Sequence, residues 1–128
     1  MASLIYLDTH VVVWLYAGLQ ERFSSKATEL IAQEELYISP IVILELQYLY
    51  ETGRTAESGD RVVQDLTQRV ALQVCDREFP AVVSAALRHG WTRDPFDRLI
   101  VAQAELQRDK LLTKDQTIRR RYRQAVWS

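Results

Sequence analysis

The chain has 128 residues, of which 48% are hydrophobic, and this is enough for the core of one domain. Its formal net charge of −1 at pH 7 excludes a polycation that binds nucleic acid through its overall charge, so a local patch would have to make any such contact. The single cysteine, Cys75, excludes an intrachain disulfide and a cysteine-based zinc site. The sequence shows no signal peptide and no apolar stretch of ~20 residues, so we expect a cytoplasmic protein without a membrane span.

The first half of the chain predicts alternating strands and helices. Short apolar segments that begin and end at polar residues are typical of buried strands. Gly18 and Gly53 are expected to end helices, and Pro40 is expected to open one. The polar residues 54–59 are expected to form a loop. The expected strands are 3–8 and 36–39, and the expected helices are 9–17, Ser24 or Ser25 to Glu34, and 40–52.

The second half continues the same alternation. Gly90 is expected to end one helix, and Asp94 followed by Pro95 is expected to open the next. Strands that alternate with helices predict an α/β fold in which helices cover both faces of a parallel sheet. The expected helices are 59–69, 79–88, 94–108 and 116–121, and the expected strands are 71–74, 111–113 and an edge strand at 125–127.

Four carboxylates adjoin the apolar segments. Asp8 ends the first predicted strand, and Asp115 follows a later one. Glu45 interrupts a strongly apolar helix, and Asp97 precedes the apolar run of another. Carboxylates carried into an interior are costly unless something pairs with them, and ligands of open α/β sheets bind beyond the carboxyl ends of the strands. We therefore expect the four groups to meet there around a divalent metal ion, which prefers oxygen ligands.

Each carboxylate also has a structural explanation. Asp8 and Asp115 can cap the helices that follow them. Asp94 precedes a proline, and this favours a helix cap over a metal ligand. Asp97 lies in the first turn of its helix, where the helix dipole favours a negative charge. Glu45, in the middle of an apolar helix, is the carboxylate that folding alone explains least.

Other polar residues accompany the carboxylates. The hydroxyls of Thr9 and Thr113 are candidates for a supporting role, in which they orient a ligand or a water; an ordinary cap and an ordinary strand residue are the alternatives. His10 and His89 are weaker candidates for metal binding than for local packing or bonding. The three tryptophans are expected to pack rather than to stack on bases.

A basic cluster follows the last carboxylate. Cations next to an acidic site can hold phosphates, although a run of charges is more commonly a solvated surface. Arg93 and Arg98 are placed to join the same rim. The cluster consists of Arg119, Arg120, Arg121 and Arg123, and the candidates for phosphate contact are Arg98, Arg119, Arg120 and Arg121.

Four motifs spread over essentially the whole chain resemble, in their order, those of the PIN domain family. They resemble more closely the VapC-type toxins of prokaryotic toxin–antitoxin modules. The resemblance implies a single PIN domain over residues 1–128, with a three-layer α/β/α sandwich around a central four- to five-stranded parallel sheet. The motifs are residues 7–11 (LDTHV), 39–45 (SPIVILE), 94–104 (DPFDRLIVAQA) and 112–115 (LTKD).

The resemblance also implies an activity and partners. It implies an endoribonuclease that depends on Mg²⁺ or Mn²⁺, a small antitoxin that inhibits it, and a homodimer or a larger hetero-oligomer with the antitoxin. A metal held by carboxylates can lower the pKa of a water and neutralise charge on a phosphodiester, and hydrolysis would leave 5′-phosphate and 3′-hydroxyl ends. The acidic quartet of the family maps onto Asp8, Glu45, Asp97 and Asp115, and Asp94 matches a further acidic position.

Three alternatives stay open at this point. One is a PIN-domain nuclease of RNA maturation or turnover, and another is a binding module with a vestigial site, although no acidic position is missing. The third is a receiver-like signalling domain that is phosphorylated on Asp76, with Asp8 and Lys114 beside it. The third alternative leaves Glu45 and Asp97 without a role.

Overall fold

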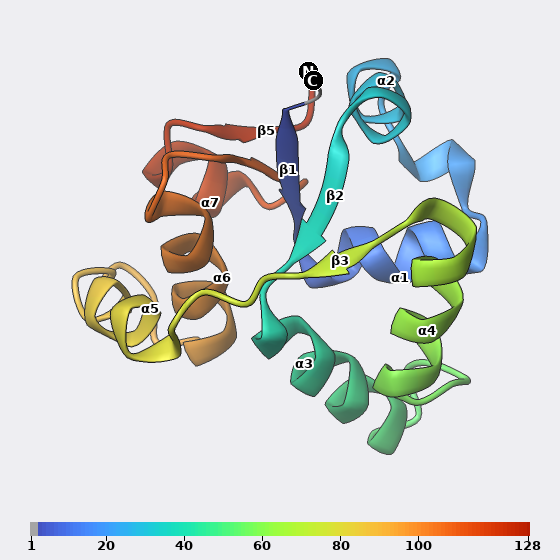
Figure 1. The fold of residues 1–128 in the computed structure, drawn as a ribbon, viewed down its shortest axis with the longest axis horizontal. Coiled ribbons are helices and arrows are strands. Elements are labelled where there is room, and N and C mark those ends of the chain that lie inside the picture. The colour runs from blue at the N-terminus through green and yellow to red at the C-terminus, as the bar shows by residue number, and fades with distance from the viewer. Residues whose placement is uncertain (1–2) are drawn as a thin grey trace.

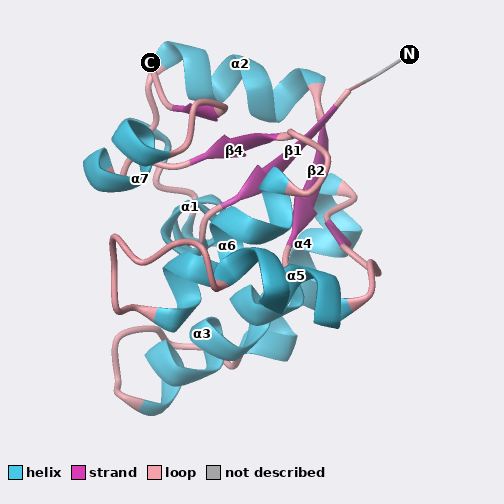
Figure 2. Ribbon diagram, turned by 90° about the vertical axis from the view of Figure 1, so that its left-hand side faces the viewer, coloured by secondary structure: helices cyan, strands magenta, loops and turns pink. Residues whose placement is uncertain are grey.

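Residues 3–128 are described by the computed structural model, and Met1 and Ala2, with which the predicted domain begins, lie outside the described residues. Five parallel strands form the central sheet, and helices flank it (Figures 1 and 2). The strands are β1 (Leu4–Leu7), β2 (Glu35–Ile38), β3 (Gln73–Val74), β4 (Lys110–Leu112) and β5 (Ala125–Val126). The helices are α1 (Thr9–Ala17), α2 (Ser25–Gln33), α3 (Pro40–Glu51), α4 (Gly59–Val70), α5 (Phe79–Ala86), α6 (Pro95–Glu105) and α7 (Gln116–Arg121), with a short 3₁₀ helix, η1 (Gln20–Arg22). The predicted three-layer α/β/α fold is confirmed.

The strand order is β3-β2-β1-β4-β5, with all neighbours parallel. The chain moves outward from β1 through β2 to β3 and then returns to place β4 on the other side of β1. The direction of winding therefore reverses at β1, and ligands of open α/β sheets bind beyond such a point. Receiver domains have the order 2-1-3-4-5, so the sheet contradicts the receiver-like alternative.

The core lies between the sheet and the helices on each side of it. Figure 1 shows α1, α2 and α4 on one side of the sheet and α5, α6 and α7 on the other, with α3 near the carboxyl ends of β1 and β2. β1 is buried because both of its faces are covered, and Ile5 and Leu7 are fully inaccessible to solvent. None of the helices formed by residues 3–128 is long and apolar enough to cross a membrane.

Two of the three helix ends predicted from a glycine are confirmed, and the third lies elsewhere. Gly18 (φ 71°) ends α1, and Gly53 (φ 77°) follows α3, each in the left-handed conformation that glycine adopts without strain. α5 ends at Ala86 and not at residue 88, so the prediction that Gly90 ends this helix is wrong. α4 ends where Ala71 turns left-handed at φ 57°, and this limits β3 to two residues.

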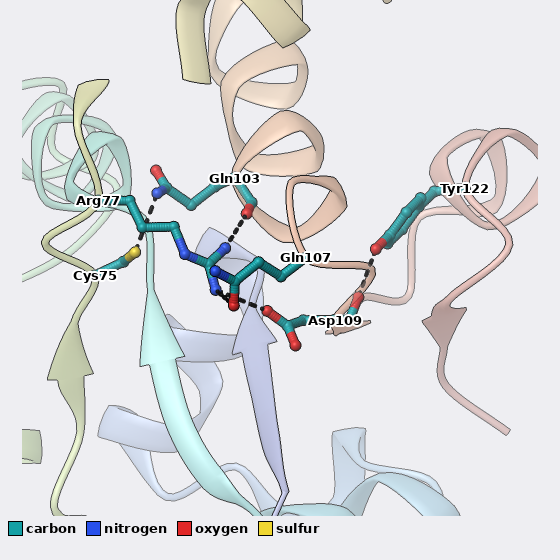
Figure 3. Close-up of polar contacts among 6 residues, drawn as sticks. All are labelled: Cys75, Arg77, Gln103, Gln107, Asp109 and Tyr122. Atoms are coloured by element: carbon teal, nitrogen blue, oxygen red, sulfur yellow. Dashed lines mark hydrogen bonds and ion pairs between the residues drawn. The ribbon is translucent and has the colours of Figure 1, made fainter. Parts of the chain in front are cut away.

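A buried polar network ties α6 to the ends of β2 and β3 (Figure 3). Gln103 on α6 is fully buried; the hydroxyl of Ser39 donates to its Oε1 at 2.8 Å, and its Nε2 donates to Cys75 Sγ at 3.2 Å. Arg77 donates to the carbonyl oxygen of Gln103 at 3.3 Å and to the Asp109 carboxylate at 3.2 Å. Because buried polar groups are costly when unpaired, these bonds hold α6, and the carboxylates near its start, against the sheet.

Candidate active site

A cleft of about 460 Å³ opens at the carboxyl ends of β1 and β4, where the winding of the sheet reverses. All four predicted carboxylates and the fifth candidate reach it: Asp94 and Asp97 from the start of α6, and the other three each from a separate part of the chain. Three further residues, which the sequence did not assign to the site, complete the lining. The lining residues are Asp8, His10, Trp14, Glu45, Asp94, Asp97, Lys114 and Asp115.

Asp8 lies between β1 and α1 and is only 7% exposed. Its Oδ1 accepts a hydrogen bond of 2.7 Å from the backbone N–H of Thr9, as an N-cap does, and its Oδ2 accepts one of 2.7 Å from the hydroxyl of Thr113. Burial raises the pKa of Asp8 above its ordinary value, and the two hydrogen bonds oppose this rise. The predicted cap and the predicted place in the site are therefore both present in one residue.

Glu45 projects from α3 into the cleft, as its position in an apolar helix indicated. The hydroxyl of Thr9 donates to its Oε1 at 2.5 Å. Burial raises the pKa of Glu45, the Thr9 bond opposes the rise, and the charges of Asp8 and Asp94 add to it. Thr9 thus contacts two carboxylates, through its backbone N–H and through its side chain.

Asp94 and Asp97 lie at the start of α6. Asp94 Oδ1 accepts from the backbone N–H of Phe96 at 2.9 Å and of Asp97 at 3.4 Å, so the predicted helix cap is present. Burial, which has the largest effect, and the charges of the neighbouring carboxylates together raise the pKa of Asp97 to about 7. Those carboxylates are, in decreasing order of effect, Asp94, Asp8, Asp115 and Glu45.

Asp115 caps α7 and is linked to Asp8 through one hydroxyl. Its Oδ1 accepts from the backbone N–H of Ile118 at 2.9 Å, and its own N–H donates to Thr113 Oγ1 at 3.1 Å. The same Thr113 hydroxyl donates to Asp8, as described above. Thr113 is fully buried, so it fixes the spacing of the two strand ends that carry these carboxylates.

The donor chemistry of the cleft fits a hard divalent cation, because five carboxylates supply only oxygen ligands. Within the described residues, none of these five carboxylates forms an ion pair with a lysine, arginine or histidine. Across residues 3–128, no three His, Cys, Asp or Glu side chains converge closely enough to form a ready-made metal group. The carboxylates therefore surround the cleft without closing on a single point.

The predicted phosphate-contacting arginines lie elsewhere. Arg98 donates from Nε to the carbonyl of Ala86 and from Nη2 to that of Leu87, both at 3.2 Å, so its guanidinium caps the end of α5. Arg121 and Arg123 line a separate cleft of about 500 Å³ at the far end of α7. Of the described residues that line the acidic cleft, none is an arginine. The full predicted set, Arg98, Arg119, Arg120 and Arg121, thus lies outside this lining, and phosphate contact by these residues stays a prediction.

The sequence reasoning missed the parts of the lining that are not acidic. From the sequence, His10 is a weak candidate and Trp14 is expected to pack, and Lys114 stands out only within the LTKD motif and in the receiver-like alternative. A signal for two of them was present, because His10 and Trp14 are four residues apart on α1 and so share one face of this helix. Lys114 lies between two residues already singled out, Thr113 and Asp115.

Comparisons with known proteins bear on the family and the fold of the chain. A family model described as the PIN domain matches residues 5–124. No curated protein sequence matches the chain significantly. Three solved structures resemble it at identities that support a common fold alone. The first is VapBC2 from Rickettsia felis bound to a DNA fragment from their promoter, with a TM-score of 0.67 and 19% identity over 98% of this chain and 99% of that chain. The second is a toxin–antitoxin complex from Klebsiella pneumoniae, with a TM-score of 0.66 and 20% identity over 97% of this chain and 96% of that chain. The third is FitAB bound to an IR36 DNA fragment, with a TM-score of 0.55 and 18% identity over 97% of this chain and 94% of that chain. Because the family model spans nearly the whole chain and its fold is present, the chain belongs to the PIN domain family.

Proposed function

We propose that residues 1–128 form a single PIN domain that acts as a metal-dependent endoribonuclease, the toxin of a toxin–antitoxin module. Members of the PIN domain family are nucleases. The observation that carries the proposal is the gathering of five carboxylates in one cleft, close enough that four of them raise the pKa of Asp97. Carboxylates that lie this close together make each other's ionisation unfavourable, and such an arrangement is typical of a site that binds a cation.

Mg²⁺ or Mn²⁺ is the proposed ion. Asp8, Glu45, Asp97 and Asp115 would hold it, with Asp94 as an outer ligand. When bound, the ion would lower the pKa of a water and neutralise charge on the phosphate of the substrate. A carboxylate whose pKa lies near 7 also makes ion binding dependent on pH, because the proton that Asp97 takes up must leave before it can ligate.

The residues of the chain itself orient the acidic groups. The Thr9 hydroxyl turns Glu45 towards the cleft, and the Thr113 hydroxyl holds Asp8, so that both threonines have the predicted supporting role in this proposal. Burial of Asp8 limits the access of water to its carboxylate. These contacts prepare the acidic groups before a substrate arrives, and such preorganisation is what makes electrostatic stabilisation effective.

A small antitoxin is the proposed protein partner. One structural neighbour is described as a toxin–antitoxin complex, and the other two are described as VapBC2 and FitAB. An apolar groove of about 300 Å³ beside α1 and α4, lined in part by Val13, Tyr16 and Val62, offers a surface for an antitoxin segment. Exposed Leu44 and Tyr48 on α3 support the proposal of a homodimer or a larger hetero-oligomer in the cytoplasm.

The activity is tested by RNA cleavage with Mn²⁺ or Mg²⁺ and with EDTA. We expect cleavage that needs the metal, leaves 5′-phosphate ends and is lost in Asp8→Asn and Asp97→Asn. Asp76→Asn is the matched control, since Asp76 is exposed after β3 and outside the cleft lining. Equal cleavage in EDTA, or in the two cleft variants, would overturn the nuclease mechanism.

The toxin role has a separate test. Induction of the wild-type chain should arrest growth, and coexpression of the small protein encoded beside it should relieve the arrest. Asp97→Asn should not arrest growth. An active nuclease that leaves growth unchanged would favour RNA maturation or turnover over the toxin role.

A further inference from the structure

One part of the cleft lining is cationic and aromatic. It consists of His10 and Trp14 on α1 and Lys114 between β4 and α7, and we name these three residues the cationic wall. The rings of His10 and Trp14 lie 6.3 Å apart, and Lys114 Nζ lies 6.0 Å from the centre of the Trp14 ring. Residues about 100 positions apart in the sequence therefore form one continuous surface beside the carboxylates.

Trp14 is a fixed platform within this wall. Its indole packs edge-on against Phe23 at 6.3 Å and Trp127 at 5.9 Å between ring centres. The guanidinium of Arg22 lies 5.6 Å from the ring centre. The face of an indole attracts a cation, so Trp14 restrains the otherwise flexible Lys114 side chain.

Lys114 is a cation of the cleft lining that has no carboxylate partner within the described part of the chain. Among residues 3–128 its ammonium group forms no ion pair, although five carboxylates line the same cleft. Its backbone neighbours are fixed, because Thr113 bonds to Asp8 and Asp115 caps α7. The ammonium is thus held beside the acidic groups while its hydrogen-bonding capacity stays available to a ligand.

The ligand chemistry that fits this arrangement is a phosphate of the substrate strand. A lysine ammonium binds phosphate oxygens as a point charge, and the carboxylates exclude a second anion from the rest of the cleft unless a metal is bound. A cleft of about 460 Å³ accepts one phosphate with its sugar more readily than a helical duplex. Unpaired RNA segments can turn single nucleotides out in this way.

We propose that the cationic wall is the subsite for the phosphate next to the scissile one in single-stranded RNA, and that Lys114 holds this phosphate. The proposal rests on the proposed nuclease function, and it adds a binding residue that is not a metal ligand. Trp14 acts as a positioning residue for the Lys114 ammonium. The wall determines where along the strand the scissile phosphate meets the carboxylates.

The test measures the affinity of a fluorescent single-stranded RNA oligonucleotide at several KCl concentrations, in an Asp97→Asn background that prevents cleavage. We expect Lys114→Gln to weaken binding by about tenfold at low salt and to reduce the slope of log K against log[salt] by ~0.7, the value for one phosphate contact on a single strand. Lys114→Arg should retain most of the affinity. Trp14→Leu should weaken binding less than Lys114→Gln.

The matched control is Lys26→Gln, because Lys26 is also exposed but lies on α2, near the amino ends of the strands (Figure 1). Unchanged affinity and salt slope in Lys114→Gln, or an equal loss in Lys26→Gln, would overturn the subsite. Wild-type cleavage of RNA in Mn²⁺ is measured in parallel. If cleavage occurs but Lys114→Gln binds normally, the subsite alone is wrong, whereas absent cleavage removes the nuclease function itself.

Discussion

Removing the charge of Asp97 should stabilise the metal-free protein at pH 8. Burial and the neighbouring carboxylates raise the pKa of Asp97 from 3.8 to about 7. A rise of this size corresponds to at most about 4 kcal/mol of unfavourable ionisation, and because the side chain is partly accessible to water, we expect ~1–2 kcal/mol. Since the folded pKa lies above the unfolded one, this destabilisation is absent well below pH 4, grows as the pH rises and is complete above pH 7.

Urea unfolding in EDTA measures this effect. Asp97→Asn should exceed the wild type by ~1–2 kcal/mol in free energy of unfolding at pH 8 and by roughly a third of that or less at pH 4. Mg²⁺ should stabilise the wild type more than the variant, because only the wild type keeps the full set of ligands. Asp76→Asn serves as the control without a pH-dependent gain. Equal stability of Asp97→Asn and the wild type at both pH values would refute the reasoning.

Three further changes test the supporting contacts. Gln103→Leu should lower the free energy of unfolding by about 1–3 kcal/mol in urea melts, because the buried partners of Gln103 lose their hydrogen bonds. Gln68 is exposed on α4, so Gln68→Leu should change the free energy of unfolding little. Equal effects of the two substitutions would contradict the role of the network. Thr113→Val should weaken Mn²⁺ binding in calorimetry by about tenfold, since Asp8 loses its oriented hydrogen bond; unchanged affinity would contradict this. Ala71→Gly should raise the melting temperature, because a left-handed alanine costs about 1 kcal/mol that glycine avoids; a lower melting temperature would show that the strain is absent.

The fold could be predicted where the signals are local. Apolar runs of four residues and the glycines at 18 and 53 determined strands and helix ends that the structure confirms. The end of α6 was predicted three residues too late, at Arg108. Arg108 itself adopts φ 57° without being glycine, so no residue type marked the stop.

The acidic half of the site could be predicted for the same reason. Asp8 and Asp115 follow strands directly, and Glu45 interrupts an apolar helix, so each carries its own local signal. The spacing of His10 and Trp14 could be read from the sequence, but their union with Lys114 into one wall could not, because the contact of Lys114 with Trp14 depends on the pairing of β1 with β4. Arg98 shows the converse: its position suggested a rim contact, but tertiary packing directs its guanidinium to α5.

The central claim is that the carboxylates of one cleft bind the divalent ion on which RNA cleavage depends. Its most direct test is the rate of single-stranded RNA cleavage as a function of Mn²⁺ concentration, for the wild type and for Glu45→Gln, with folding of both checked by melting. We expect a rate that saturates with Mn²⁺ in the wild type, is abolished by EDTA and needs much more Mn²⁺ in the variant. A rate that is independent of Mn²⁺, or the same dependence in both proteins, would contradict the claim.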